Sequence, residues 1–162
     1  MQNKVLRIIC LSLFVLAFGL FCASFSGEFM HYIYSEGPRS GTQNLVTLKA
    51  SDFFETPLIM FLVLLGLLFG LLLALFVEKK EIRFLGLGLG LAGFAYSLYV
   101  AISIINVAID TEAKRTNFYN MEFSPCLYLY FISVFLFGAL LVIALFNSVL
   151  SKSKKNLETK AV

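Results

Sequence analysis

The sequence predicts an all-α membrane protein: an up-down four-helix transmembrane bundle with a short extracellular β-hairpin-like element in its first outer loop. Apolar runs long enough to cross a bilayer, which takes about 20 residues per helix, cover residues 5–25, 57–77, 84–109 and 124–150. The chain is 59% apolar and only 14% charged, which lies outside the range of soluble domains. The charges between the runs are also distributed as a membrane topology requires.

The charged residues separate into two groups if the N-terminus lies in the cytoplasm. The cytoplasmic segments then carry nine basic and three acidic residues, a net charge of +6, and the outer segments carry four basic and seven acidic residues, a net charge of −3. Lys and Arg in short loops favour the cytoplasmic side. We therefore expect a protein of the plasma membrane with both termini cytoplasmic.

The chain is expected to form one domain, residues 1–162. Helices are expected over about residues 5–26, 57–77, 83–109 and 124–150, outer loops over 27–56 and 110–123, and a cytoplasmic tail over 151–162. The first apolar run is longer than that of a signal peptide, so we expect an uncleaved helix. The short connection at 78–83 and the modest one at 110–123 make successive helices antiparallel neighbours.

The first outer loop contains two segments that favour β-structure, residues 29–34 and 45–49. Between them lies a stretch rich in turn-forming residues, which predicts a hairpin. An isolated hairpin is marginal in water, so it needs support from the helices or from a further strand. Thr56 and Pro57 then suit the N-cap and the first position of the second helix.

Small residues recur at helical spacing in the second and third runs. Such faces allow two helix backbones to approach closely in a membrane. They predict either packing within the bundle or a docking face for a partner or a second copy. On the second helix the face consists of Gly66, Gly70 and Ala74; on the third it consists of Gly86 and Gly90, with Gly93, Ser97 and Ala101 on another stripe.

Polar side chains mark one side of the third helix near the outer leaflet. They are Tyr96, Tyr99, Ser103 and Asn106. One interpretation is an outward-facing pocket for a lipid or a small amphiphile. The other is an aromatic belt at the membrane interface, with hydroxyls bonded to neighbouring helices.

Cysteine and histidine offer little site chemistry. Cys22 and Cys126 lie near the outer ends of the first and fourth helices, and Cys10 lies near the inner end of the first. Buried free thiols are the default expectation. A disulfide between Cys22 and Cys126 is the alternative, and it requires Cα atoms within about 7 Å. The single histidine, His31, lies near acidic residues in the outer loop. We expect a solvated side chain; a weak metal-binding or pH-sensing site is the alternative. We expect no metal and no cofactor.

Catalytic and transport signatures are weak. No Asp, Glu, Lys, Arg or His lies deep in an apolar run, whereas proton relays and ion pathways usually contain such residues. The outer acid pairs, Asp52 with Glu55 and Asp110 with Glu112, have the pattern of solvated helix flanks. The basic residues are scattered beside the membrane, which disfavours a nucleic-acid partner. The basic tail Lys152–Lys160 is expected to fix the topology; binding of anionic lipid headgroups is the alternative.

Four short motifs give the chain a family resemblance. Basic residues precede the first helix, Asp52-Phe53-Phe54 ends the first outer loop, Glu78-Lys79-Lys80 follows a Leu-rich helix, and Glu122-Phe123-Ser124 enters an aromatic fourth helix. The arrangement resembles the small four-pass tetraspan proteins of low-GC Gram-positive bacteria, most without an assigned function. Its layout also resembles claudin-type tetraspans, although residues 27–56 contain neither the Trp nor the two cysteines of the claudin motif.

These observations predict a non-enzymatic integral membrane interaction protein, an accessory or protective subunit of a larger membrane system. Its expected partners are membrane lipids and either another membrane protein or a second copy of itself. The alternative is an oligomeric pore or a small-molecule or lipid carrier, which could be lined by hydroxyl and backbone groups. A membrane-embedded enzyme is the weakest of the three hypotheses.

Overall fold

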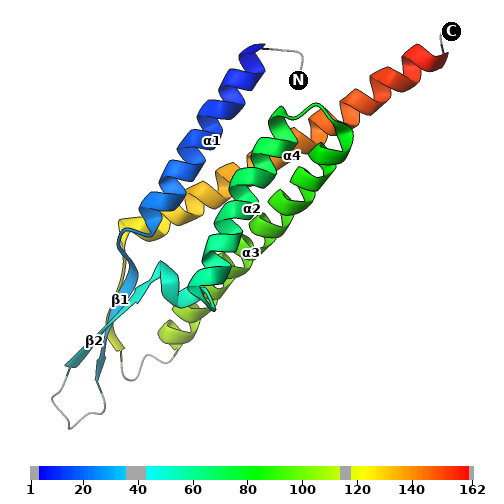
Figure 1. The fold of residues 1–162 in the computed structure, drawn as a ribbon. Helices are drawn as coiled ribbons and strands as arrows, with labels where there is room; N and C mark the ends of the chain where they lie inside the picture. The colour runs from blue at the N-terminus through cyan, green and yellow to red at the C-terminus, as the bar shows by residue number, and fades with distance from the viewer. Residues whose placement is uncertain (1–3, 36–42, 114–117, 161–162) are drawn as a thin grey trace.

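The computed structural model describes residues 4–35, 43–113 and 118–160. Within them the chain is mostly helical, with four α-helices and one three-stranded sheet (Figure 1). The helices are α1 (Lys4–Ser24), α2 (Pro57–Phe76), α3 (Lys80–Ala113) and α4 (Pro125–Lys160). The strands are β1 (Glu28–Ser35), β2 (Gln43–Lys49) and β3 (Phe118–Phe123), and a 3₁₀ turn, η1 (Ala50–Phe53), follows β2.

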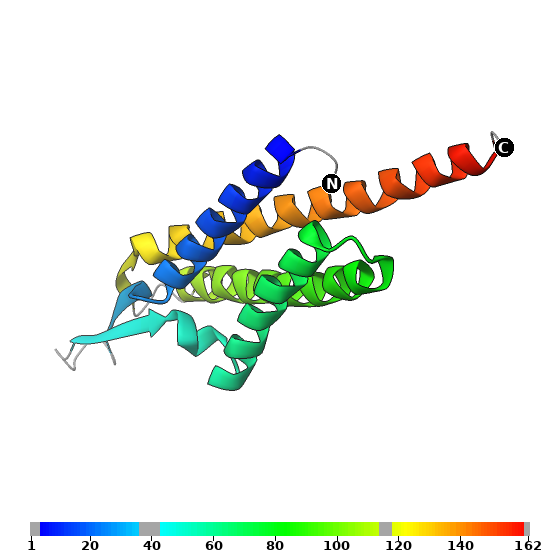
Figure 2. The same ribbon diagram turned by 45° about the horizontal axis from the view of Figure 1, so that its top comes forward.

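Successive helices run in opposite directions (Figures 1 and 2). At one end of the molecule, which we call the terminal end, α1 begins, α4 ends and α2 turns into α3. The sheet stands at the opposite end, which we call the sheet end. α2 packs most extensively on α3 and α1 on α4, and contacts between α3 and α4 join the two pairs.

Three helices in the described residues are long and apolar enough to cross a membrane: Leu58–Phe76, Lys80–Asp110 and Pro125–Asn147. The apolar part of α1, Ile8–Ser24, is shorter. The structure therefore contains three helices that could cross a membrane, α2, α3 and α4.

The ends of α2 are fixed by local hydrogen bonds. As expected, Thr56 is the N-cap: its hydroxyl accepts a hydrogen bond from the backbone N–H of Ile59 at 3.2 Å, and Pro57 occupies the first turn. At the other end Nε of Arg83 donates to the carbonyl oxygen of Val77 at 3.1 Å. That bond satisfies one of the carbonyl groups that a helix C-terminus leaves without a partner, so Arg83 closes the tight turn into α3.

The sheet has the order β2-β1-β3, with β1 antiparallel to both neighbours. The expected hairpin is present, because β1 and β2 contain the two predicted segments and pair with Ile33 opposite Leu45. The strand β3 was not predicted. It arises from the connection between α3 and α4 and pairs with β1, placing Glu122 opposite His31. The two connections at this end are thus joined in one sheet.

Two helices extend beyond their expected bounds. α3 has 34 residues and ends at Ala113 instead of 109, and α4 has 36 residues and ends at Lys160 instead of 150. The expected loop at 110–123 is consequently part helix and part strand, and the expected tail at 151–162 is helical as far as Lys160. Neither extension contains Gly or Pro, and Lys, Glu and Ala favour helix, so nothing local ends these helices earlier.

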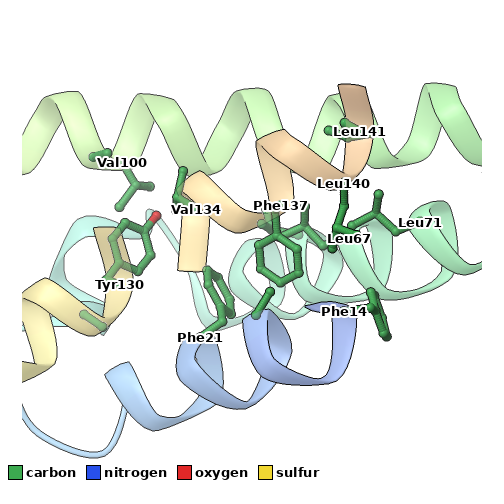
Figure 3. Packing of buried hydrophobic residues seen from close by; sticks show 14 of the residues in the cluster. Phe14, Phe21, Leu67, Leu71, Val100, Tyr130, Val134, Phe137, Leu140 and Leu141 are labelled. Carbon is green, nitrogen blue, oxygen red and sulfur yellow. The ribbon is translucent and has the colours of Figure 1, made fainter. Parts of the chain in front are cut away.

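The core consists of helix stripes with coiled-coil spacing. On α1 the buried residues alternate in steps of four and three, as do many on α4, which is the spacing of a seam between two packed helices. Figure 3 shows Tyr130 and Phe137 of α4 among side chains from the other three helices. The buried stripe of α1 is Cys10, Phe14, Ala17, Phe21 and Ser24; that of α4 includes Leu127, Tyr130, Val134, Phe137, Leu141 and Ala144.

The outward faces of all four helices carry large exposed apolar side chains. Examples are Ile8 on α1, Leu58 on α2, Ile102 on α3 and Phe135 on α4, the last of which is 76% exposed. The buried polar residues among those described are three serines, Ser24, Ser97 and Ser133. An apolar exterior of this extent suits lipid rather than water, because exposed apolar patches on soluble monomers are usually small.

Candidate functional site

The small residues of α2 and α3 face each other across one seam. A Cβ added to Gly70 would clash with the backbone nitrogen of Gly90 and would lie 2.7 Å from its Cα. A Cβ on Gly86 would lie 2.7 Å from the backbone nitrogen of Ala74 and 2.8 Å from the carbonyl oxygen of Gly70. The two backbones are therefore in direct contact, as small-residue faces permit in membrane helices.

The seam continues toward the sheet end. A Cβ on Gly66 would lie 3.3 Å from the Leu89 carbonyl oxygen, and one on Gly93 would lie 3.1 Å from the Val63 carbonyl oxygen. Gly93 lies on the same buried stripe of α3 as Gly86 and Gly90, not on a different one as expected, because steps of four and three residues keep to one side of a helix.

Beyond the glycines, α3 turns its small residues toward α4. The hydroxyl of Tyr130 donates to the backbone carbonyl of Ser97 at 2.9 Å, and the hydroxyl of Ser97 donates to the carbonyl of Gly93. Ala101 is buried one turn further along. Seven of the eight residues predicted to form a packing or partner face thus contact another helix of the chain, and the eighth, Ala101, is buried.

An aromatic cluster fastens the sheet to the helices. Its rings form a connected series in which successive centroids lie 5.1–6.1 Å apart, distances at which aromatic pairs attract. The series joins η1, β1, α4, α1 and α3, so the central strand of the sheet is fastened to three of the helices. In order its members are Phe53, Phe29, Tyr130, Phe21, Phe25, Phe54, Tyr96 and Tyr99.

The residues of the predicted outer pocket lie along one side of α3. Tyr96 belongs to the aromatic cluster, and its buried hydroxyl has no hydrogen-bond partner among the described residues. Tyr99 is 56% exposed, Ser103 donates back to the carbonyl of Tyr99, and Asn106 is exposed. The rings of Tyr96 and Tyr99 are thus in contact, while the hydroxyl of Ser103 is hydrogen-bonded to the backbone of its own helix.

The cysteines are all free in the structure. Cys22 is exposed near the end of α1, whereas Cys126 is half-buried and packs its Sγ over Gly27, where an added Cβ would lie 2.8 Å from that sulfur. The structure therefore does not join Cys22 to Cys126. The third thiol, Cys10, is buried in the seam between α1 and α4.

Two acidic residues at the sheet end, Asp52 and Glu122, have local structural roles. Asp52 accepts a hydrogen bond from the backbone N–H of Lys49 at 2.7 Å, which closes the η1 turn. Glu122 pairs across the sheet with His31 at 3.0 Å. In the described part of the chain no group of three or more His, Cys, Asp and Glu residues could hold a metal ion. The side chain of Glu112 lies outside the described residues.

Sequence reasoning missed the third strand and the aromatic cluster. The sequence did contain a signal for the strand. The segment begins at Phe118, ends at Phe123 and also contains a tyrosine, and aromatic residues favour strands. The cluster had no sequence signal, because its rings come from five separate elements. Together these two features build the sheet end into one surface.

Comparison with known proteins adds no assignment: no protein-family model and no curated protein matches the sequence. The function must accordingly be argued from the residues and their geometry.

Proposed function

We propose that this chain is a non-enzymatic, four-pass protein of the plasma membrane that presents its sheet to a membrane-protein partner, as an accessory or protective subunit of a larger membrane system. The supporting observation is that the small-residue faces are used in packing within the chain, whereas the sheet is not covered by the helices. The small-residue faces of α2 and α3 contact each other, whereas the sheet extends beyond the helices (Figure 1). The sheet end is the surface left for recognition.

The fourth span in this proposal is α1. Its 21 residues are about 32 Å long at 1.5 Å per residue, comparable with the ~30 Å hydrocarbon core of a bilayer. Its buried stripe from Cys10 to Ser24 packs along α4, which contains a segment able to cross a membrane. Its opposite face exposes Ile8 and Val15. A helix so placed shares the lipid environment of its neighbour.

The orientation follows from charge. The turn from α2 into α3 contains Glu78, Lys79 and Lys80, and Arg83 follows in the first turn of α3. This turn lies at the terminal end, together with the start of α1. The excess of Lys and Arg at this end favours the cytoplasmic side. We therefore place both termini in the cytoplasm and the sheet outside the cell.

A non-enzymatic role fits the chemistry of the sheet end. The carboxylate of Asp52 accepts a hydrogen bond from the backbone of Lys49 in the η1 turn, and that of Glu122 pairs with His31 across the sheet. General acid–base catalysis needs such groups converging on a substrate position. With these two carboxylates bonded within the sheet end, that surface is better suited to binding than to chemistry.

Co-purification tests this proposal. The chain, purified in mild detergent from native membranes, should retain one stoichiometric protein partner identified by mass spectrometry. His31→Ala with Glu122→Ala, which alters the exposed face of the sheet, should release that partner, whereas Gly88→Ala on open surface of α3 should retain it. A homo-oligomer that carries only lipid would instead support the pore or carrier alternative.

A further inference from the structure

The sheet has an unpaired edge along β2 in the part of the chain that the structure describes. The central strand β1 has β2 on one side and β3 on the other, so no described strand lies outside β2. In an antiparallel ladder, alternate residues of an edge strand turn their N–H and C=O groups away from the partner strand. Alternate residues among the seven of β2 consequently offer backbone donors and acceptors to another strand.

The middle of β2 lacks the devices that usually protect a sheet edge. Such devices are charged side chains, proline and β-bulges. From Gln43 to Leu48 the strand contains no charge and no proline, and its register against β1 is regular from Ser35 to Met30. Leu45 is 63% exposed. The edge of β2 is therefore suited to pairing with a strand from another chain.

The opposite edge is less suitable. β3 has a register shift against β1 between Ile33 and Tyr34, which is a local irregularity in the ladder. It also carries the charged Glu122. β2 also has one register shift, between Glu28 and Met30 of β1, and one charge, Lys49, but both lie at its final residue. The shift and the charge of β3 fall inside that strand, where they hinder the addition of a further strand, so β2 is the favoured edge.

The net charge of the sheet end favours a basic partner. The described side chains there include five carboxylates, against one lysine, Lys49. In the sequence segments expected outside the cell, seven acidic residues outnumber four basic ones. Complementary charge guides partners to such a surface and disfavours partners of like charge. The five carboxylates are Glu28, Asp52, Glu55, Asp110 and Glu122.

From these observations we infer that the outer edge of β2 binds an extended basic peptide segment of a partner protein, which adds a fourth strand to the sheet. The inference rests on the proposed function and specifies the chemistry of the partner. Backbone hydrogen bonds supply the affinity in this mode of recognition, and side-chain contacts supply the specificity. Here the exposed Leu45 offers an apolar contact to the peptide. The exposed carboxylates of the sheet end, Glu55 and Asp110 among them, attract its basic side chains.

Peptide binding to the full-length protein in zwitterionic nanodiscs tests the inference. The probe is a fluorescent peptide of about nine residues, long enough to cover one strand, with alternating Lys and Val. Controls are the same peptide with Glu in place of Lys and a fully N-methylated Lys/Val peptide, which keeps the charge but has no backbone donors. Only the unmethylated basic peptide should bind, and it should slow amide hydrogen exchange within residues 45–47. Equal binding of the N-methylated peptide, or no binding of any, would overturn the inference.

Matched variants locate the binding site. Leu45→Lys should abolish binding, because it places a positive charge on the edge itself. Glu55→Gln should weaken binding about two- to fivefold at low salt, the effect of losing one exposed charge pair. Glu81→Gln, the same change at the terminal end, should leave binding unchanged. Equal weakening by Glu55→Gln and Glu81→Gln would show attraction by net charge alone and would overturn the inference.

Photo-crosslinking in native membranes separates this inference from the proposed function. A photoreactive residue at position 45 should capture a basic segment of the same partner that co-purifies with the chain. Capture at position 122 but not at 45 would contradict the edge and leave the proposed function standing. Failure at both positions, without a co-purifying partner, would contradict both. A second copy of this chain captured at 45 would replace the peptide by edge-to-edge pairing and overturn the inference.

Discussion

Gly70 on α2 lies against the backbone of Gly90 on α3, with no space between them for a β-carbon. The contact is central to the seam that holds α2 and α3 together. Because backbone atoms form it, a side chain at Gly70 cannot be accommodated by a change of rotamer. The helices themselves would have to move apart.

The first prediction concerns this contact. Gly70→Ala should destabilise the protein by about 1–3 kcal/mol, the usual cost of overpacking a tight core. Gly88→Ala is the matched control, since a Cβ there meets nothing within 4 Å. Both can be measured by reversible unfolding in mixed detergent micelles. Equal stability of the two variants would contradict the seam.

The sequence indicated the small-residue faces but not whether they pack against each other or against another protein. Glycines spaced by four residues show that a close approach is possible, yet the same pattern serves contacts within a chain and contacts between chains. The stripe on α1 from Cys10 to Ser24 was harder to recognise. Nearly every residue of that helix is apolar, so hydrophobic periodicity does not distinguish the buried side from the lipid-facing side.

The sheet shows a second limit of sequence reasoning. The hairpin of β1 and β2 is local, and the turn-forming residues between its strands indicated it. Pairing of β3 joins His31 to Glu122, residues that are 91 positions apart, and no local pattern reports such a distant partner. The same holds for the aromatic cluster, whose members Phe29 and Tyr130 come from a strand and a distant helix.

The second prediction concerns Tyr130. Tyr130→Phe removes only its hydrogen bond to Ser97 and should cost about 0.6 kcal/mol, the average for such bonds between membrane helices. Phe21→Ala removes a ring that contacts Phe25, Tyr130 and Phe137, and should cost about 3–5 kcal/mol. Unfolding of both variants in the same detergent provides the comparison. A larger loss for Tyr130→Phe would show that hydrogen bonding, rather than ring packing, dominates the cluster.

The third prediction concerns the turn between α2 and α3. Arg83→Met removes the donor to the Val77 carbonyl and should cost about 0.5–1.5 kcal/mol, the net contribution of a typical hydrogen bond. Lys80→Met, in which an exposed side chain only approaches the ring of Phe84 at 5.9 Å, should cost less. The same unfolding measurement ranks the two, and the reverse order would argue against capping by Arg83.

The fourth prediction concerns the thiols. Protein unfolded without a reductant should react with three equivalents of an alkylating reagent, because Cys10, Cys22 and Cys126 are free. Intact mass spectrometry reads the number directly. Uptake of a single equivalent would reveal a disulfide that the structure does not contain.

The proposed topology, with four spans, the sheet outside the cell and both termini inside, can be measured by labelling whole cells with a membrane-impermeant maleimide. Single cysteines are introduced at Asn3, Leu45 and Lys79 in a chain whose own cysteines are replaced by serine. We expect position 45 to react in intact cells, and positions 3 and 79 to react only after permeabilisation. If position 3 reacted in intact cells while 79 did not, α1 would not cross the membrane, and the four-pass topology would be wrong.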